Sequence, residues 1–181
     1  TSYTSNNLTF DVKFAPTASD TGRAPANAAT GQSKNLVETG SAFTDGTDGD
    51  AQSDSQWEVD EEGTFVTPEW TDTVTSVTSV TVNTTDGAFA GNRAGQTELA
   101  CGTTYSWRFR YKDNGGVTSQ EWSSWSNTWT FTTVPCGPDA TSVTYQLNSD
   151  GARSGYSATI SGSGFGTANA GSRANCIGGA G

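Results

Sequence analysis

The chain has 181 residues, which is enough for one large or two small β domains. Its formal net charge of −10 disfavours nucleic acid and anionic membranes as partners, because binding to phosphate groups needs a net basic surface. The chain has no histidine, the commonest general base, and no apolar run near the roughly 18 residues of a membrane helix, which disfavours an enzyme and a membrane span. No helical periodicity of useful length appears, so the sequence predicts an all-β protein.

The first segment, residues 1–15, carries an unusually clear amphipathic pattern. Four large apolar residues alternate with polar ones, which is the period of a strand with one apolar face: Leu8, Phe10, Val12 and Phe14. Pro16 then ends the strand. Because such a face is too apolar to stay in water, we expect it to pack against other strands.

The next part of the chain indicates short strands with polar connections. Residues 17–35 are rich in alanine, threonine, glycine and asparagine, and we expect them to be irregular. Four strands are expected after them, marked by Leu36, Val37, Ala42 and Phe43; by Trp57 and Val59; by Phe65, Val66 and Trp70; and by Val80 and Val82.

An acidic loop separates the first two of these strands. Its carboxylates, Asp45, Asp48, Asp50 and Asp54, could gather around one Ca²⁺ ion, which prefers six to eight oxygen ligands. The spacing only approximates the Asp-x-Asp-x-Asp-Gly pattern of known calcium loops. A solvated surface loop without a metal is the other interpretation, and the sequence leaves both open.

A long β-hairpin follows, and it carries most of the large aromatic residues. In its first strand, Tyr105, Trp107, Phe109 and Tyr111 alternate with Ser106, Arg108, Arg110 and Lys112, which predicts one aromatic and one cationic face. A turn-rich segment at 113–116 leads to the second strand, which contains Trp125, Trp129 and Phe131. We expect this hairpin to form the core of a β-sandwich.

The hairpin also carries a resemblance to a known family. The stretch CGTTYSWRFRYKDNGGVTSQEWSSWSNTWTFTTVPC, residues 101–136, resembles the last two strands of a fibronectin type III domain in the form common in bacterial surface proteins. The earlier strands match more loosely. The resemblance implies a fibronectin III-like β-sandwich over residues 16–136.

Within this stretch, Trp122-Ser123-Ser124-Trp125-Ser126 matches the WSxWS box of class I cytokine receptors, which share the fibronectin fold. In that box the indoles stack between arginines of the neighbouring strand. The resemblance therefore implies a tryptophan–arginine ladder of Arg108, Arg110, Trp122 and Trp125, with cation–π attraction of about 0.5–2 kcal/mol per pair. We interpret it as a stiffening element of one sheet edge, because five residues do not imply a receptor.

Two of the three cysteines flank the hairpin. Cys101 precedes its first strand and Cys136 follows its second, so antiparallel pairing brings the two together. We expect a disulfide there, with free thiols as the alternative, and a disulfide would indicate an oxidising, extracellular or cell-surface location. Cys176 is left over, either buried and free or paired with another chain.

The last segment, residues 137–181, indicates a second and shorter unit. Val143, Tyr145 and Leu147 alternate with polar residues, and the stretch ATISGSGFGT at 158–167 resembles the first half of an IPT/TIG immunoglobulin-like domain. About 45 residues supply roughly half of the strands of such a sandwich. Residues 1–16 are similar to the part that is missing, so the N-terminal strand is expected to complete this domain.

The strand could complete the unit of a neighbour, either in a tandem array within one chain or by donation between identical subunits. It could also complete the unit of its own chain, or lie at the edge of the fibronectin-like domain. Head-to-tail completion would give a structural subunit or repeat of an extracellular filament, a pilus-like fibre or a surface adhesin. The alternative is a receptor-like or carbohydrate-binding module of a secreted protein. Exposed, coplanar tryptophans would favour carbohydrate, whereas tryptophans that are buried or stacked on arginine would favour the structural interpretation.

Overall fold

A computed structural model describes residues 13–46, 49–115, 121–137, 139–147 and 156–163 of the chain, and in the last two ranges it describes the backbone. The chain divides into two compact units, Thr1–Pro135 and Cys136–Gly181. The predicted boundary lay one residue later, between 136 and 137. The predicted strand at 1–15 lies mostly outside the described residues.

The regular secondary structure of the first unit is almost entirely β-strand, and the prediction of an all-β protein is confirmed. Its strands are β1 (Ala29–Gln32), β2 (Val37–Thr39), β3 (Gln52–Asp60), β4 (Trp70–Thr75), β5 (Ser79–Thr81), β6 (Ala88–Phe89), β7 (Thr104–Asp113) and β8 (Trp129–Thr133). One turn of 3-10 helix, η1 (Gly91–Arg93), lies between β6 and β7. No helix in the described part of the chain is long and apolar enough to cross a membrane.

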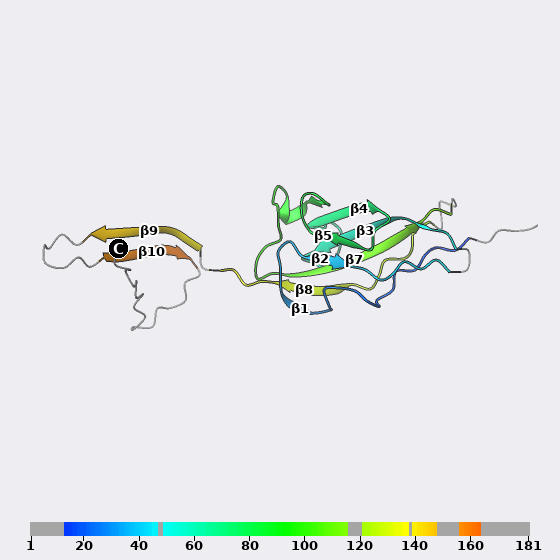
Figure 1. Ribbon diagram of the computed structural model, residues 1–181, viewed down its shortest axis with the longest axis horizontal. Helices are drawn as coiled ribbons and strands as arrows, with labels where there is room; N and C mark the ends of the chain where they lie inside the picture. The colour runs from blue at the N-terminus through cyan, green and yellow to red at the C-terminus, as the bar shows by residue number, and fades with distance from the viewer. Residues whose placement is uncertain (1–12, 47–48, 116–120, 138, 148–155, 164–181) are drawn as a thin grey trace, which may run out of the picture. The chain divides into compact units, whose positions relative to one another are not determined.

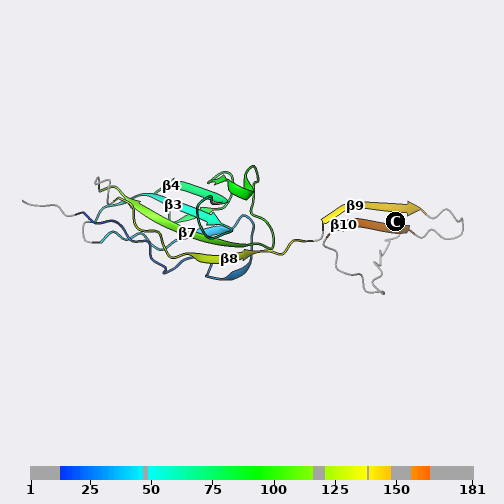
Figure 2. The ribbon, with the colours of Figure 1, turned by 180° about the vertical axis from the view of Figure 1, so that it is seen from behind.

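The strands form two sheets. A six-stranded sheet has the order β1-β8-β7-β3-β4-β6, and a two-stranded sheet pairs β2 with β5. Figures 1 and 2 show β3, β4, β7 and β8 side by side from opposite directions. The β1–β8 pair is parallel and the other pairs of the large sheet are antiparallel, so this sheet is mixed.

The core of the first unit lies between the two sheets. β3, β4, β7 and β8 contribute Trp57, Val59, Trp70, Tyr105, Trp107, Phe109, Tyr111 and Phe131, and the side of β2 and β5 contributes Leu36, Val80 and Val82. Every second residue of β7 from Tyr105 to Asp113 is buried. Strict alternation along the sequence thus becomes one buried and one outward face.

Two sequence predictions about this unit are wrong. The segment 17–35 was expected to be irregular, but it contains β1, which adds to the edge of the large sheet beside β8. Its Ala- and Gly-rich sequence gives little strand signal, and the pairing depends on a partner about 100 residues later. Four residues were assigned to strands but lie in connections: Ala42 and Phe43 follow β2, which ends at Thr39, and Phe65 and Val66 precede β4, which begins at Trp70.

The second unit contains the strands β9 (Asp139–Leu147) and β10 (Tyr156–Ser163). They form an antiparallel pair with one irregularity in register between Ser161 and Gly162. The segments expected to form strands, around 143–147 and 155–166, thus pair with each other. In the described part of the chain, each of these two strands pairs with the other alone.

Candidate functional site: the tryptophan–arginine ladder

The outward face of β7 carries three cations in alternation with its buried aromatic residues. Arg108, Arg110 and Lys112 are half-buried, whereas Trp107, Phe109 and Tyr111 between them are fully buried. Because the side chains of i and i+2 lie on the same face of a strand, the three cations form a row. This row is the base of the candidate site.

Aromatic rings alternate with these cations to form a ladder. The Arg108 guanidinium carbon lies 4.2 Å from the centroid of the Trp125 ring, and that of Arg110 lies 4.5 Å from Trp125 and 4.6 Å from Trp122. The Lys112 ammonium nitrogen lies 5.9 Å from the Trp122 ring. The structure therefore brings together all four residues that the WSxWS resemblance implied.

Phe65 extends the ladder at the other end and was not predicted. Its ring centroid lies 4.0 Å from the Arg108 guanidinium carbon. Phe65 has a φ of 56°, a left-handed conformation that is uncommon for a bulky residue. Its amide donates to the Asp60 carboxylate, which holds this turn in place. The sequence shows only that Phe65 is apolar. Its contact with Arg108 depends on the conformation of the turn.

The segment that carries Trp122 and Trp125 is fixed to β7 by its serines. The Oγ atoms of Ser123 and Ser126 accept hydrogen bonds from the amides of Tyr111 and Phe109, both at 3.1 Å. The amides of the same serines donate to the carbonyl oxygens of Tyr111 and Phe109 at 2.8 and 2.9 Å. The two tryptophans and the two serines each recur after three residues, the repeat of a polyproline II helix, so each pair occupies one face of the segment.

Each cation of the ladder also has a polar partner on a neighbouring segment. Arg108 pairs with Glu58 at 2.7 Å, and Lys112 pairs with Glu121 at 3.2 Å. Nε of Arg110 donates to Gln56 at 2.8 Å. Burial lowers the pKa of Arg110, and the nearby Arg108 lowers it further while Glu58 opposes the shift. Every cation of the ladder is therefore held by a polar partner, and two of the three are paired with a carboxylate.

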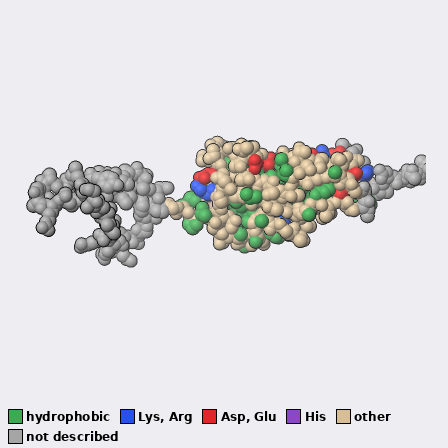
Figure 3. All heavy atoms as spheres, in the orientation of Figure 1, with side chains coloured by type: hydrophobic (Ala, Val, Ile, Leu, Met, Phe, Trp, Pro, Cys, Tyr) green, Lys and Arg blue, Asp and Glu red, His purple; other side chains and the backbone are tan. Residues whose placement is uncertain are grey.

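The remaining four tryptophans are also either fully buried or stacked against a cation. Trp57, Trp70 and Trp107 have no exposed area. Trp129 is partly buried, and the Arg23 guanidinium carbon lies 4.2 Å from its ring centroid. On the face seen in Figure 3, hydrophobic side chains are scattered among polar ones. All six tryptophans are thus buried or stacked against a cation.

Arg23 is a second buried cation that the sequence analysis missed. Its guanidinium carbon lies 4.3 Å from the ring centroid of Trp107, and its Nη1 donates to Asp20 and to the carbonyl oxygen of Asn127 at 2.8 and 2.7 Å. Burial lowers the pKa of Arg23, and Asp20 and Glu38 oppose the shift. An arginine in an irregular, polar segment gives no sequence signal of burial.

Cys101 and Cys136 are joined by a disulfide, so this prediction is confirmed. Close by, the amide of Gly102 donates to the carbonyl oxygen of Val134 at 2.7 Å. The bond closes the β7–β8 hairpin at the end opposite its turn. Cys176 lies outside the described residues.

The acidic loop is described in part, since Asp48 lies outside the described residues. The Lys13 ammonium group lies 3.0 and 3.1 Å from the two carboxylate oxygens of Asp50. Asp45 accepts a hydrogen bond from the Asp50 amide at 2.7 Å, and Asp54 accepts one from Ser53 at 3.0 Å. Within the described ranges, no group of three or more acidic, cysteine or histidine side chains could hold a metal ion.

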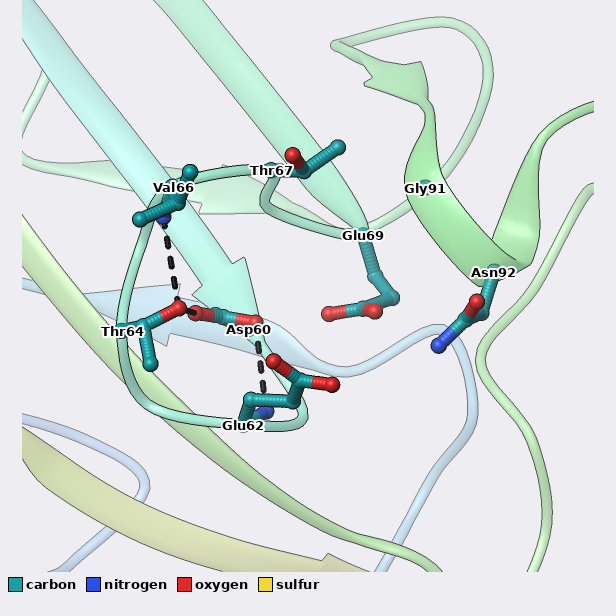
Figure 4. Close-up of a pocket in the computed structure, with 8 residues that line it drawn as sticks. All are labelled: Asp60, Glu62, Thr64, Val66, Thr67, Glu69, Gly91 and Asn92. Atoms are coloured by element: carbon teal, nitrogen blue, oxygen red, sulfur yellow. Dashed lines mark hydrogen bonds between the residues drawn. The ribbon is translucent and has the colours of Figure 1, made fainter.

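A pocket of about 340 Å³ lies between the β3–β4 connection and η1 (Figure 4). Two of its carboxyl groups, Asp60 and Glu69, are buried. Asp60 accepts hydrogen bonds from the Glu62 and Phe65 amides and from the Thr64 hydroxyl, and Glu69 accepts one from the Glu61 amide. Burial raises the pKa of Glu69, and the adjacent Asp60 adds to the rise. These carboxyl groups hold the connection that carries Phe65.

Of the predicted assembly strand, Leu8, Phe10 and Val12 lie outside the described residues. Phe14 is 49% exposed and lines a shallow hollow with Ala15, Thr17 and Gly46. The neighbouring Lys13 forms an ion pair with Asp50, with 3.0 Å between Nζ and Oδ2.

Comparisons with known proteins give little further information. No protein-family model and no curated protein matches the sequence. Among solved structures, the chain is similar to α-L-rhamnosidase from Dictyoglumus thermophilum, with 16% sequence identity over 82% of this chain and a TM-score of 0.47. The chain spans 16% of the length of that protein.

Proposed function

We propose that this chain is a structural module of an extracellular filament, pilus-like fibre or surface adhesin. The observation that carries the proposal is that all six tryptophans are buried or stacked against a cation. A carbohydrate-binding surface needs aromatic faces that are open to the ligand. In this chain Arg108 and Arg110 lie over the ring of Trp125, and Arg110 lies over the ring of Trp122, which favours a mechanical role over ligand binding.

The strand arrangement supports a fibronectin III-like identity for the first unit. The order β8-β7-β3 matches the G-F-C order of immunoglobulin-like sandwiches, and the β2–β5 pair matches their B–E pair. The disulfide adds a covalent cross-link, which is typical of proteins in oxidising compartments. Such a cross-linked sandwich with an additional cation–π ladder suits an extracellular load-bearing module.

Assembly is proposed to occur through residues 1–15. In the sequence, Leu8, Phe10, Val12 and Phe14 alternate with polar residues and would make one apolar face of a strand; burying four such side chains is worth on the order of 6–12 kcal/mol before the entropy of ordering the strand is subtracted. We propose that this strand adds to the β9–β10 sheet of the next copy. A heterologous contact of this kind propagates into a fibre.

Electron microscopy and light scattering of the purified chain over a range of concentrations test the proposal. We expect fibres or a concentration-dependent series of oligomers. Phe10→Asp with Val12→Asp should abolish them, because both changes put charge on the apolar face. Asn7→Asp with Thr9→Asp adds two similar charges to the opposite face and should leave assembly intact.

A chain that stays monomeric at every concentration would contradict the assembly proposal, as would a structure in which residues 5–15 pack wholly against their own chain. Saturable quenching of tryptophan fluorescence by an oligosaccharide, abolished by Trp122→Ala, would favour the carbohydrate-binding alternative.

A further inference from the structure

The interior of the first unit contains polar atoms that the ladder does not use. Arg23 Nε and Nη2, both carboxylate oxygens of Glu38 and Trp107 Nε1 are buried, and none has a hydrogen-bond partner in the described part of the chain. Glu38 and Trp107 have no exposed area, and the Arg23 side chain has none. Buried donors and acceptors are normally paired, so five such atoms in one unit require an explanation.

Backbone pairing places these side chains close to one another. Ala24 and Thr39 form an antiparallel bridge, with hydrogen bonds of 2.9 and 2.7 Å between their backbones. Arg23 and Glu38 each neighbour one of these residues, so they lie on the same face of the pair as diagonal neighbours. The Arg23 guanidinium group lies over Trp107, and it interacts electrostatically with Glu38. The three side chains thus come from three segments and share one region of the core.

The chemistry of the cluster indicates the kind of molecule that it would bind. Its unpaired atoms are three nitrogens, which carry four N–H donors, and two carboxyl oxygens, so a matching ligand must both donate and accept hydrogen bonds. The charge of Arg23 is already paired with Asp20 at 2.8 Å, so no further ion is needed for neutrality. We propose that Arg23, Glu38 and Trp107 bind internal water, about two molecules, because each water supplies two donors and two acceptors.

This hydration site would connect parts of the chain that are far apart in sequence. Arg23 belongs to the segment before β1, Glu38 is in β2, and Trp107 is in the middle of β7. Water that bridges them would join the segment before β1 and the small sheet to the large sheet. The site is independent of the proposed assembly through residues 1–15.

Nuclear Overhauser measurements between water and indole N–H groups test the proposal on the intact protein. The chain supplies its own controls, because three tryptophans are fully buried but only one has an unpaired Nε1. Trp57 Nε1 donates to the Ser55 hydroxyl at 2.9 Å, and Trp70 Nε1 donates to the carbonyl oxygen of Asn83 at 2.8 Å. We expect a cross-peak with long-lived water at Trp107 Nε1–H that is absent at Trp70. Trp57 is the control for an indirect signal, because its Nε1–H donates to a hydroxyl group whose proton exchanges with water.

Two variants locate the site. Glu38→Leu removes the whole carboxyl group and should abolish the water cross-peak of Trp107, whereas Glu38→Gln keeps one acceptor and one donor group in place and should preserve it. Equal water contact at Trp107 and Trp70 in the unmodified protein would overturn the proposal, whether or not the variants fold. A crystal structure in which Arg23 and Glu38 bond directly to each other, with no water between them, would also overturn it.

Discussion

Glu38 is a charged residue at an inward-facing position of β2. Leu36, Glu38 and Gly40 face the core, whereas Val37 between them is 56% exposed. By hydrophobicity alone, Val37 would be buried instead of Glu38. A shift of register by one residue would bury Val37, but it would also expose Leu36. Gly40 fixes the register as well, since a Cβ atom there would lie 2.5 Å from the Tyr111 hydroxyl oxygen and 2.9 Å from the Phe109 ring. The inward Glu38 thus follows from the packing of its two neighbours.

The titration of Glu38 should make the protein less stable as the pH rises. Burial raises the pKa of Glu38 well above its ordinary value of 4.5, although the nearby Arg23 opposes the shift. Above pH 4.5 the unfolded chain loses this proton while the folded chain keeps it. Each further pH unit then lowers the free energy of unfolding by about 1.4 kcal/mol, until the pH reaches the pKa of Glu38 in the folded state.

Glu38→Gln should remove this dependence. Urea unfolding of both proteins between pH 5 and 8 measures this dependence. The other carboxyl groups contribute equally to the free energy of unfolding of both proteins, so they cancel when one value is subtracted from the other. We expect the advantage of the variant over the unmodified protein to grow with pH. A difference that stays constant over this range would show that Glu38 is ionised in the folded protein.

At the scale of elements, β7 organises the unit through both of its faces. Its buried aromatic residues form the core, and its outward cations carry the ladder. β8 pairs only with the first part of β7, Thr104–Trp107, and the WSxWS segment covers the same edge beyond it. The predicted long hairpin is therefore completed by serine side chains where regular strand pairing stops.

Ser126→Ala should destabilise the unit by about 1–3 kcal/mol, because it leaves the buried amide of Phe109 without its acceptor. Ser124→Ala in the same segment changes an exposed residue and serves as the control, with an expected effect within about 0.5 kcal/mol. Urea unfolding followed by tryptophan fluorescence measures both. Equal effects of the two variants would mean that the serine hydroxyl does not support β7.

For the acidic loop, we expect Ca²⁺ to leave the melting temperature unchanged. The reason is that the Lys13 ammonium group already pairs with the Asp50 carboxylate. Thermal unfolding with calcium and with a chelator measures the effect. A rise with calcium that Asp48→Ala with Asp50→Ala abolishes would instead establish the loop as a calcium site.

At the scale of the whole molecule, the disulfide between Cys101 and Cys136 is a covalent cross-link between residues that are far apart in the sequence. The bond closes the segment that contains β7, the WSxWS box and β8. A cross-link of this kind restricts the unfolded chain more than the folded one.

Replacing Cys101 and Cys136 together by serine should therefore lower the stability by roughly 2–4 kcal/mol. Chemical unfolding measures the loss, and peptide mapping without reductant identifies the bonded pair. Cys176→Ser is the matched control and should leave the stability unchanged. A map in which Cys176 is bonded to Cys101 or Cys136 would contradict the assignment.

The sequence by itself determined the features that depend on local pattern. The alternation of aromatic and cationic residues defined β7 and both of its faces, and the placement of Cys101 and Cys136 about the hairpin indicated their bond. The resemblance to the WSxWS box, in which indoles stack between arginines of the neighbouring strand, named four members of the ladder. The period of the side chains encodes the two faces of β7, and the turn between the two strands of one hairpin is enough to bring its ends and its facing residues together.

Only the tertiary structure decided the features that join distant segments. β1 exists because a weakly patterned Ala–Gly segment meets β8, and Phe65 joins the ladder because a strained turn points it at Arg108. Arg23 is buried because its guanidinium group lies over the rings of Trp107 and Trp129, and Glu38 is buried because the packing of Leu36 and Gly40 fixes the register of β2. A residue's own polarity predicts solvent exposure, and it is overridden where packing around it fixes the register and supplies partners.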